Sequence, residues 1–193
     1  MKDFNRPYKR DQSIPANKPV FWTDLRVPAQ NTRLNPSHSE PQFLEFTDGL
    51  FLYKFSTANS DTDSVHFVAQ LPHSYKEGSD IHPHIHWAPD NADTGDVRWQ
   101  FEYIIANRNE TFPSVAISET ITEAADGIAL NHQRRGFSVI DGTGITISAM
   151  IICRLTRLSS SDGLDTFTGN ACFLEFDFHI QQDILGSLTE LIK

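Results

Sequence analysis

Three histidines stand at alternate positions in the segment His82-Pro83-His84-Ile85-His86. If this segment is a β-strand, the three imidazoles share one face, about 7 Å apart at successive positions. Two imidazoles at that spacing could bind one metal ion of the zinc, iron, nickel or copper type. Residues of other expected strands that could complete the ligand set are Glu102, Glu175, Asp177 and His179.

The same segment resembles the first metal motif of cupins, with Gly78, His84 and His86 at the family's spacing and Asp90 where cupins usually place Glu. The resemblance covers about twenty residues, and no second motif follows, because His179 lacks the preceding proline and glycine pattern. Cupin ligands point into the barrel, whereas here the residues opposite the histidines are apolar. We therefore favour a solvent-facing or subunit-facing row of histidines, with a structural transition metal or a cupin-like metal enzyme as alternatives.

The elements that must position these histidines are strands. From Gln42 onward, short runs of alternating apolar and polar residues are separated by turn-forming segments, a pattern typical of antiparallel sandwiches. Unequal connections favour an all-β, jelly-roll-like antiparallel sandwich of about eight strands over a tight meander. Only residues 119–130 and a last turn at 187–192 could be helical. The expected strands are 51–56, 65–71, 80–87, 97–106, 115–122, 133–140, 145–155 and 171–180.

The first 41 residues contain six of the ten prolines, which exclude a helix and favour extended backbone. This stretch is also too apolar to remain in water. We therefore divide the chain into an extended, proline-rich, basic N-terminal arm at 1–41 and a sandwich body at 42–193. Docking of the arm on a neighbouring copy is favoured over folding back on its own domain. The expected interface residues are Phe21, Trp22, Leu25, Arg26 and Arg33.

Charge is distributed unevenly along the chain, whose net charge is −9. Residues 1–33 carry seven Lys or Arg and three Asp, a balance of +4. Subtracting these from the totals of 16 basic and 25 acidic residues leaves nine and 22, so the rest of the chain carries −13. An acidic body repels nucleic acid, and the natural partner of the basic arm is the acidic surface of a neighbouring subunit.

Neither compartment signals nor catalytic motifs are evident in the sequence. The N-terminus has no apolar stretch of signal-peptide length, and the longest apolar run, residues 149–153, is too short to span a bilayer, so we expect synthesis in a cytoplasm and no membrane partner.

Cys153 and Cys172 lack zinc-site spacing and are interpreted as reduced core thiols. Residues 142–144, Gly-Thr-Gly, do not open a helix, which argues against phosphate binding. No nucleophile, base and orienting group occur together, so we assign no catalytic residues and expect no enzyme.

Three segments resemble uncharacterised proteins encoded among tailed-phage and prophage virion genes. They are WTDL at 22–25, QLPHSYKEGSDIHPHIHW at 70–87 and FHIQQDILGS at 178–187. The resemblance spans most of the chain and implies a virion structural protein made in the host cytoplasm, either a capsid cement (decoration) subunit or a tail or fibre-associated subunit.

The physical interpretation agrees with an assembly role, since an ordered extended arm adds contact area that no compact monomer offers. We expect a homo-oligomer, with a trimer favoured, and contacts with other virion proteins such as the major capsid protein. No cofactor is expected beyond the metal considered above. A cupin-like enzyme and a glycan-binding module with exposed aromatics such as Trp22 or Trp87 are the alternatives.

Overall fold

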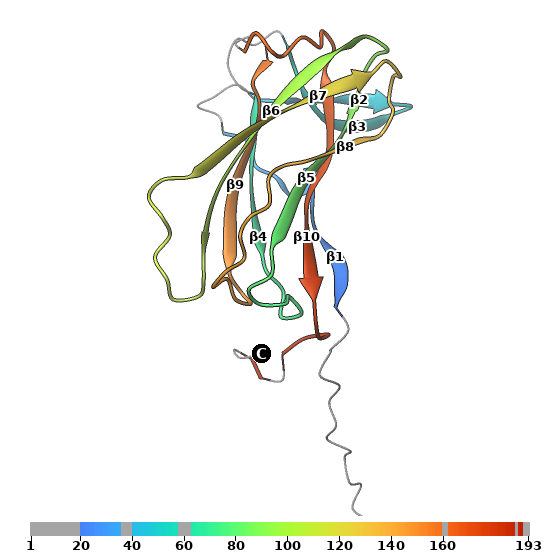
Figure 1. The fold of residues 1–193 in the computed structure, drawn as a ribbon. Helices are drawn as coiled ribbons and strands as arrows, with labels where there is room; N and C mark the ends of the chain where they lie inside the picture. Colours follow the sequence, from blue (N-terminus) through green and yellow to red (C-terminus); the bar gives the residue numbers. More distant parts are fainter. Residues whose placement is uncertain (1–19, 36–39, 58–62, 160–161, 188, 191–193) are drawn as a thin grey trace, which may run out of the picture.

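The computed structural model describes residues 20–35, 40–57, 63–159, 162–187 and 189–190. Within these ranges the chain forms two antiparallel sheets that share one core (Figure 1), which confirms the expected all-β sandwich. No helix in the described part is long and apolar enough to cross a membrane. The first sheet contains β2 (Gln42–Thr47), β3 (Leu50–Phe55), β10 (Ala171–Gln182), β5 (Ile81–Pro89), β8 (Gln133–Gly136) and β1 (Phe21–Pro28). The second contains β4 (Ser64–Gln70), β9 (Met150–Arg157), β6 (Thr94–Ala106) and β7 (Ile117–Asp126).

Aromatic side chains from both sheets fill the core. The alternation in β6 directs Trp99 and Phe101 inward, where both are buried. Phe101 stacks on Phe176 of β10 with ring centroids 4.7 Å apart, and Phe67 of β4 lies 5.0 Å from the same ring. These contacts join the two sheets face to face. Because the inward-facing aromatics occur at alternate positions of each strand, period-two patterning is sufficient to predict most of the strands.

Residues 119–130, the body segment that could have been helical, mostly belong to strand β7. Ten consecutive residues of β7 pair with β6, from Asp126 opposite Thr94 to Ile117 opposite Tyr103. This ladder satisfies the backbone groups of a segment rich in β-branched Ile and Thr, which pack well on a pleated surface. Part of the expected turn at 187–192 lies outside the described residues.

Part of the expected arm belongs to the sandwich itself. Residues 21–28 form β1, which pairs along its whole length with β10 of the same chain, from Phe21 opposite Gln182 to Pro28 opposite Glu175. In Figure 1 this blue strand lies beside the red last strand. Val27 is buried in the core. The structure thus shows the fold-back arrangement for this stretch, and the sandwich extends N-terminally of residue 42; residues 1–19 lie outside the described part.

β1 folds back because β10 would otherwise present an open edge. Only Ala171–Phe173 of β10 pair with β3, whereas the residues from 175 to 182 pair with β1 along the same edge. An unpaired edge leaves backbone donors and acceptors without partners, and β1 supplies them. Beyond β1, the 3-10 helix η1 (Ala29–Asn31) leads the chain over to β4.

β2 and β3 form a hairpin that extends beyond the sheet. Its two-residue turn, Asp48–Gly49, has positive φ at both positions, 46° and 78°. Two positive φ values are what a type I′ turn requires, and Asp-Gly provides them at low steric cost. Only the last three residues of β3 pair with β10, so most of the hairpin has no further strand beside it (upper right in Figure 1).

Candidate functional site

The three histidines of β5 lie on the outer face of the first sheet. Ile81 and Ile85, which alternate with them along the strand, face the core and are fully buried. The ligands of a cupin would point inward, so the arrangement here differs from that family. The register between β5 and β10 sets each histidine opposite a titratable residue of β10. The pairs are His82 with His179, His84 with Asp177, and His86 with Glu175.

The centre of this face is the carboxylate of Asp177. Its side chain and that of His84 are both nearly inaccessible to solvent. Asp177 Oδ1 contacts His84 Nε2, and Asp177 Oδ2 lies 3.5 Å from His86 Nε2. Beyond these imidazole–carboxylate contacts, neither Oδ1 nor His86 Nε2 has a hydrogen-bond partner within the described part of the chain. A buried carboxylate oxygen in that state favours a cation close to it.

A third histidine, His179, approaches the centre from β10 itself. Its ring centroid lies 4.4 Å from that of His84 in an edge-on arrangement. His179 Nε2 lies 2.5 Å from Oδ1 of Asp24 on β1, which leaves Nδ1 available. His84, in turn, has Nδ1 3.4 Å from the backbone carbonyl oxygen of His82. The ligand atoms offered by His84, Asp177 and His179 lie within 4.8 Å of one another.

A neighbouring group of His86, Glu175 and Asp177 also places its ligand atoms within 4.8 Å. Arg26 competes for this group, because its guanidinium binds the Glu175 carboxylate at 2.6 and 3.0 Å. His86 Nδ1 lies 2.6 Å from Nε2 of His132. An open cavity of about 300 Å³ adjoins the group and is lined by Arg26, His86, His132, Leu174 and Glu175.

Burial and charged neighbours shift the pKa values of two residues at the site. Burial lowers the pKa of His86, and the nearby His84 and His132 lower it further, although Asp177 and Glu175 partly oppose the shift. The neutral imidazole that results is the form that binds metals. Glu175, by hydrogen bond and charge, raises the pKa of Arg26, so Arg26 is protonated at neutral pH.

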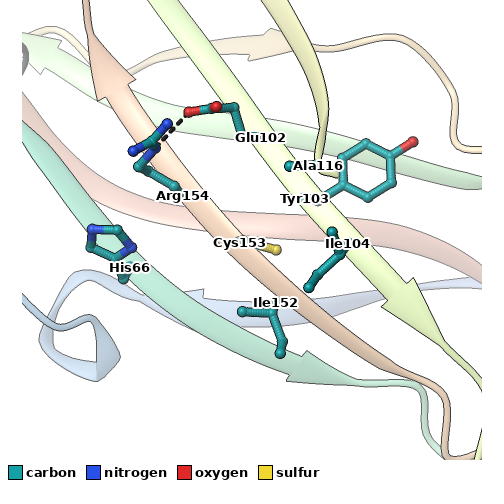
Figure 2. A pocket seen from close by; sticks show the side chains of 8 residues that line it. All are labelled: His66, Glu102, Tyr103, Ile104, Ala116, Ile152, Cys153 and Arg154. Carbon is teal, nitrogen blue, oxygen red and sulfur yellow. Dashed lines mark hydrogen bonds and ion pairs between the residues drawn. The ribbon is translucent and has the colours of Figure 1, made fainter. Parts of the chain in front are cut away.

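Glu102, a candidate ligand, lies far from the histidines in the fold. It belongs to β6 of the second sheet, where its Oε2 accepts a hydrogen bond from Arg154 Nε at 2.5 Å (Figure 2). The structure therefore brings His179 to His84 but leaves Glu102 elsewhere. Glu102 borders a shallow pocket of about 210 Å³, lined by His66, Glu102, Tyr103, Ile104, Ala116, Ile152, Cys153 and Arg154.

Two of the five expected interface residues remain exposed on β1. Phe21 and Trp22 are 60% and 54% exposed. The Trp22 ring meets the imidazole of His82 edge-on, with centroids 5.1 Å apart. A large aromatic side chain thus borders the histidine face and remains available to a partner or ligand.

The other three expected interface residues make contacts within the chain. Leu25 packs against the core, and Arg26 binds Glu175 as described above. Arg33 exchanges two backbone hydrogen bonds with His66 of β4, at 2.7 and 2.8 Å. These contacts hold the N-terminal segment on its own domain.

Sequence reasoning missed two contributors to the site. Asp24 belongs to the stretch predicted to form an arm docked on a neighbouring copy, so the sequence does not predict its contact with His179. His132 precedes the short strand β8, and no periodic pattern relates it to His86. Asp177 was named only as one of several candidate ligands, although its alternation with His179 along the last strand was the signal that pointed to this centre.

Gly142, in the Gly-Thr-Gly segment, has a packing role. A Cβ at this position would lie 1.8 Å from the backbone oxygen of Ser79 and 2.8 Å from the hydroxyl of Tyr75. Only glycine allows the two chain segments to approach this closely. Residue 142 is thus explained by chain packing, without a phosphate ligand.

No protein-family model matches the chain, and no curated protein matches it. Among solved structures, a family 35 carbohydrate-binding module from Clostridium thermocellum is 10% identical, with a TM-score of 0.42, over 81% of this chain and 97% of that one. An isomalto-dextranase from Arthrobacter globiformis T6 is 12% identical, with a TM-score of 0.42, over 80% of this chain and 23% of that one. Tailspike protein 4 of bacteriophage CBA120 is 9% identical, with a TM-score of 0.34, over 84% of this chain and 19% of that one. At these values the likeness is one of β-rich architecture alone.

Proposed function

We propose that this protein is a structural, non-catalytic subunit of a tailed-phage virion, and that copies of the chain join through the hairpin β2–β3. The observation that carries the proposal is the apolar surface of this hairpin. Four of its large hydrophobic side chains are exposed. They are Phe43, Leu44, Leu50 and Phe51, between 46% and 66% exposed.

Both faces of the hairpin carry large apolar side chains. On one face Phe43 stacks on Phe51 with centroids 5.8 Å apart and meets Tyr53 edge-on at 5.3 Å. On the other face Leu44 lies opposite Leu52 in the register of the two strands. A hairpin at the surface of a monomer normally shows at least one polar face, so apolar residues on both faces indicate that a partner covers them.

The free energy available from covering the hairpin is substantial. Burying one Leu or Phe side chain that is otherwise exposed contributes about 1.5–3 kcal/mol. Several such side chains, half-exposed and adjacent, could therefore supply several kcal/mol towards association. β2 also stands at the end of the strand order, so its outer edge can pair with a strand of another copy.

The virion assignment comes from the sequence resemblance, and the unequal charge of the chain agrees with it. The basic first 33 residues and the acidic remainder are complementary in charge, which suits contacts within the chain, such as Arg26 with Glu175, and also contacts between copies. Capsid decoration and attachment to the tail are the two positions proposed within the particle, with the major capsid protein or a tail protein as the further partner.

Oligomeric mass, measured by light scattering during size-exclusion chromatography, tests the assembly role. We expect the full chain to run as a multiple of 21.8 kDa, and a Phe43→Ser, Phe51→Ser variant to shift to that mass itself. Val115→Ser is the matched control, because Val115 is 77% exposed but lies outside the hairpin. A wild-type monomer, or a hairpin variant with unchanged mass, would refute the proposal.

The N-terminal segment requires a separate truncation. Removing residues 1–40 would also delete β1, so loss of assembly could reflect a damaged sheet. Removing residues 1–19 leaves every described strand in place. Light scattering on this shorter deletion reports what the basic, proline-containing residues 1–19 contribute to assembly. Antibody labelling of phage particles in electron micrographs distinguishes head from tail.

Glycan binding is the second candidate function, and the exposed Trp22 beside His82 is the observation that favours it. Aromatic rings next to polar side chains are suited to stacking on sugars. A glycan array probed with the full chain and with Trp22→Ala tests it, and binding that survives the substitution would exclude this site.

A further inference from the structure

The buried carboxylate of Asp177 has an environment that is unusual for a structural ion pair. It lies between two imidazole nitrogens, Nε2 of His84 and Nε2 of His86, and apart from the contact with His84 its Oδ1 has no hydrogen-bond partner within the described residues. A buried ion pair retained for stability normally has its remaining hydrogen bonds satisfied. This arrangement instead leaves a negative charge and lone pairs directed at a position where a cation would fit.

The donors around this position match a particular class of cation. Two imidazole nitrogens and one carboxylate oxygen, from His84, His179 and Asp177, lie within 4.8 Å of one another. Ca²⁺ and Mg²⁺ prefer sites made of oxygen ligands, whereas imidazole favours zinc, nickel, copper and iron. Three protein ligands leave one further position for water in a tetrahedral zinc site.

Contacts behind the two histidines support the same conclusion. A metal-binding histidine usually engages its second ring nitrogen with a carboxylate or a backbone carbonyl, which fixes the ring and its tautomer. His179 has Asp24 in this role at 2.5 Å, and His84 has the carbonyl oxygen of His82 at 3.4 Å. The remaining ring nitrogens are therefore Nδ1 of His179 and Nε2 of His84, and the latter faces the Asp177 carboxylate.

We propose that His84, Asp177 and His179 bind one divalent transition-metal ion of the zinc class, and that this ion fastens β1 to the sheet through Asp24. His84 comes from β5 and the other two ligands come from β10, so the ion links adjacent strands. His179 extends the link to β1 because its second nitrogen meets Asp24. This site is separate from the hairpin and does not depend on the assembly role.

Zinc binding by the full chain tests the proposal. After dialysis against EDTA, isothermal titration with Zn²⁺ should show one ion per chain, and Co²⁺ should give the visible absorption of a tetrahedral site. Asp177→Asn and His84→Gln should abolish both signals. Asp24→Asn should keep the stoichiometry but weaken Zn²⁺ binding by about tenfold or more, because it removes only the partner of a ligand.

His82→Gln is the matched control. His82 lies on the same strand and the same face but belongs to neither group of converging ligands, and its backbone carbonyl is kept in the variant. This variant should bind Zn²⁺ as the wild type does. Circular dichroism of every variant in EDTA separates loss of a ligand from loss of the fold. The His84→Gln and Asp177→Asn variants each test a different ligand of the ion.

The link to β1 has its own readout. Zn²⁺ should slow hydrogen exchange of the β1 amides at residues 21–28 in the wild type and leave it unchanged in Asp177→Asn. The melting temperature of the wild type should rise with Zn²⁺ concentration. Failure of the wild type to bind Zn²⁺ or Co²⁺ would overturn the metal site, as would binding retained by Asp177→Asn or lost in His82→Gln. Unchanged β1 exchange would overturn the link to β1.

Discussion

The buried guanidinium of Arg157 offers the clearest test of how the sandwich is held together. Arg157 is fully inaccessible to solvent, and all five of its N–H groups are used. Two bonds go to the carboxylate of Asp165 at 2.8 and 3.0 Å. The other three go to the backbone carbonyls of Phe55, Phe167 and Gly169, at 2.7 to 3.0 Å. One side chain thus ties β9 to β3 and to the loop before β10.

Arg157→Met keeps much of the side-chain volume but removes every one of these bonds, and it leaves the Asp165 charge buried. Removing one partner of a buried ion pair destabilises a protein by about 3–5 kcal/mol. Native domains are stable by only about 5–15 kcal/mol, so this loss is a large fraction of the total. For a chain of this length it corresponds to a fall in melting temperature of between about 6 and 20 °C.

Urea unfolding followed by tryptophan fluorescence and by circular dichroism measures this loss. The free energy of unfolding of Arg157→Lys should lie between those of the wild type and Arg157→Met, because lysine keeps the charge but lacks the planar guanidinium. Arg108→Met is the control, since Arg108 is exposed and should change stability by less than about 0.5 kcal/mol. If Arg157→Met costs less than about 1 kcal/mol, the reasoning about this buried network is refuted.

Three further predictions follow from buried groups and close packing. Burial raises the pKa of Cys172 to about 12 and that of Cys153 well above its usual value, so a thiol reagent at pH 8 should label both only after unfolding; fast labelling of the native protein would contradict this. Burial also raises the pKa of Glu123 above its value in the unfolded chain. The native state thus favours the protonated carboxyl, so the stability that this group contributes is present at low pH and is lost as pH rises through the folded pKa. The free energy of unfolding in urea should therefore be larger for Glu123→Gln than for the wild type at pH 7, by a margin that shrinks at pH 4. Gly142→Ala should destabilise the fold by about 1–3 kcal/mol in thermal melts because its Cβ would meet a backbone oxygen, whereas Gly163→Ala, with open space around it, should not; equal effects would argue against a packing role.

Local sequence pattern was enough to predict most of the strands. In β6 the alternation of Trp99 and Phe101 with polar residues implies one buried face, whatever the strand pairs with. The same argument placed the histidines of β5 on one side, opposite Ile81 and Ile85, which the structure confirms as core. Patterns of this kind arise between residues two positions apart, so they can be seen without knowledge of the fold.

Partner choice could not be predicted in the same way. Glu102 and Asp177 both alternate with aromatic residues in long strands, and their local sequences are equally suited to an outward-facing carboxylate. Only the pairing of β5 with β10 brings Asp177 to the histidines, while Glu102 is carried away on the other sheet. The same holds for residues 21–28, whose proline, Pro28, favours extended backbone but does not reveal that this segment of the chain is the strand that pairs with the edge of β10.

The amino-acid sequence by itself therefore determined the fold class, most of the strands and the shared face of the three histidines, because period-two alternation depends on neighbours along the chain. The tertiary structure decided which carboxylate stands among the histidines, which edge β1 covers and which apolar surface stays open on β2–β3. Those features depend on contacts between residues far apart in the chain, and their register is set by the packing of the whole sandwich.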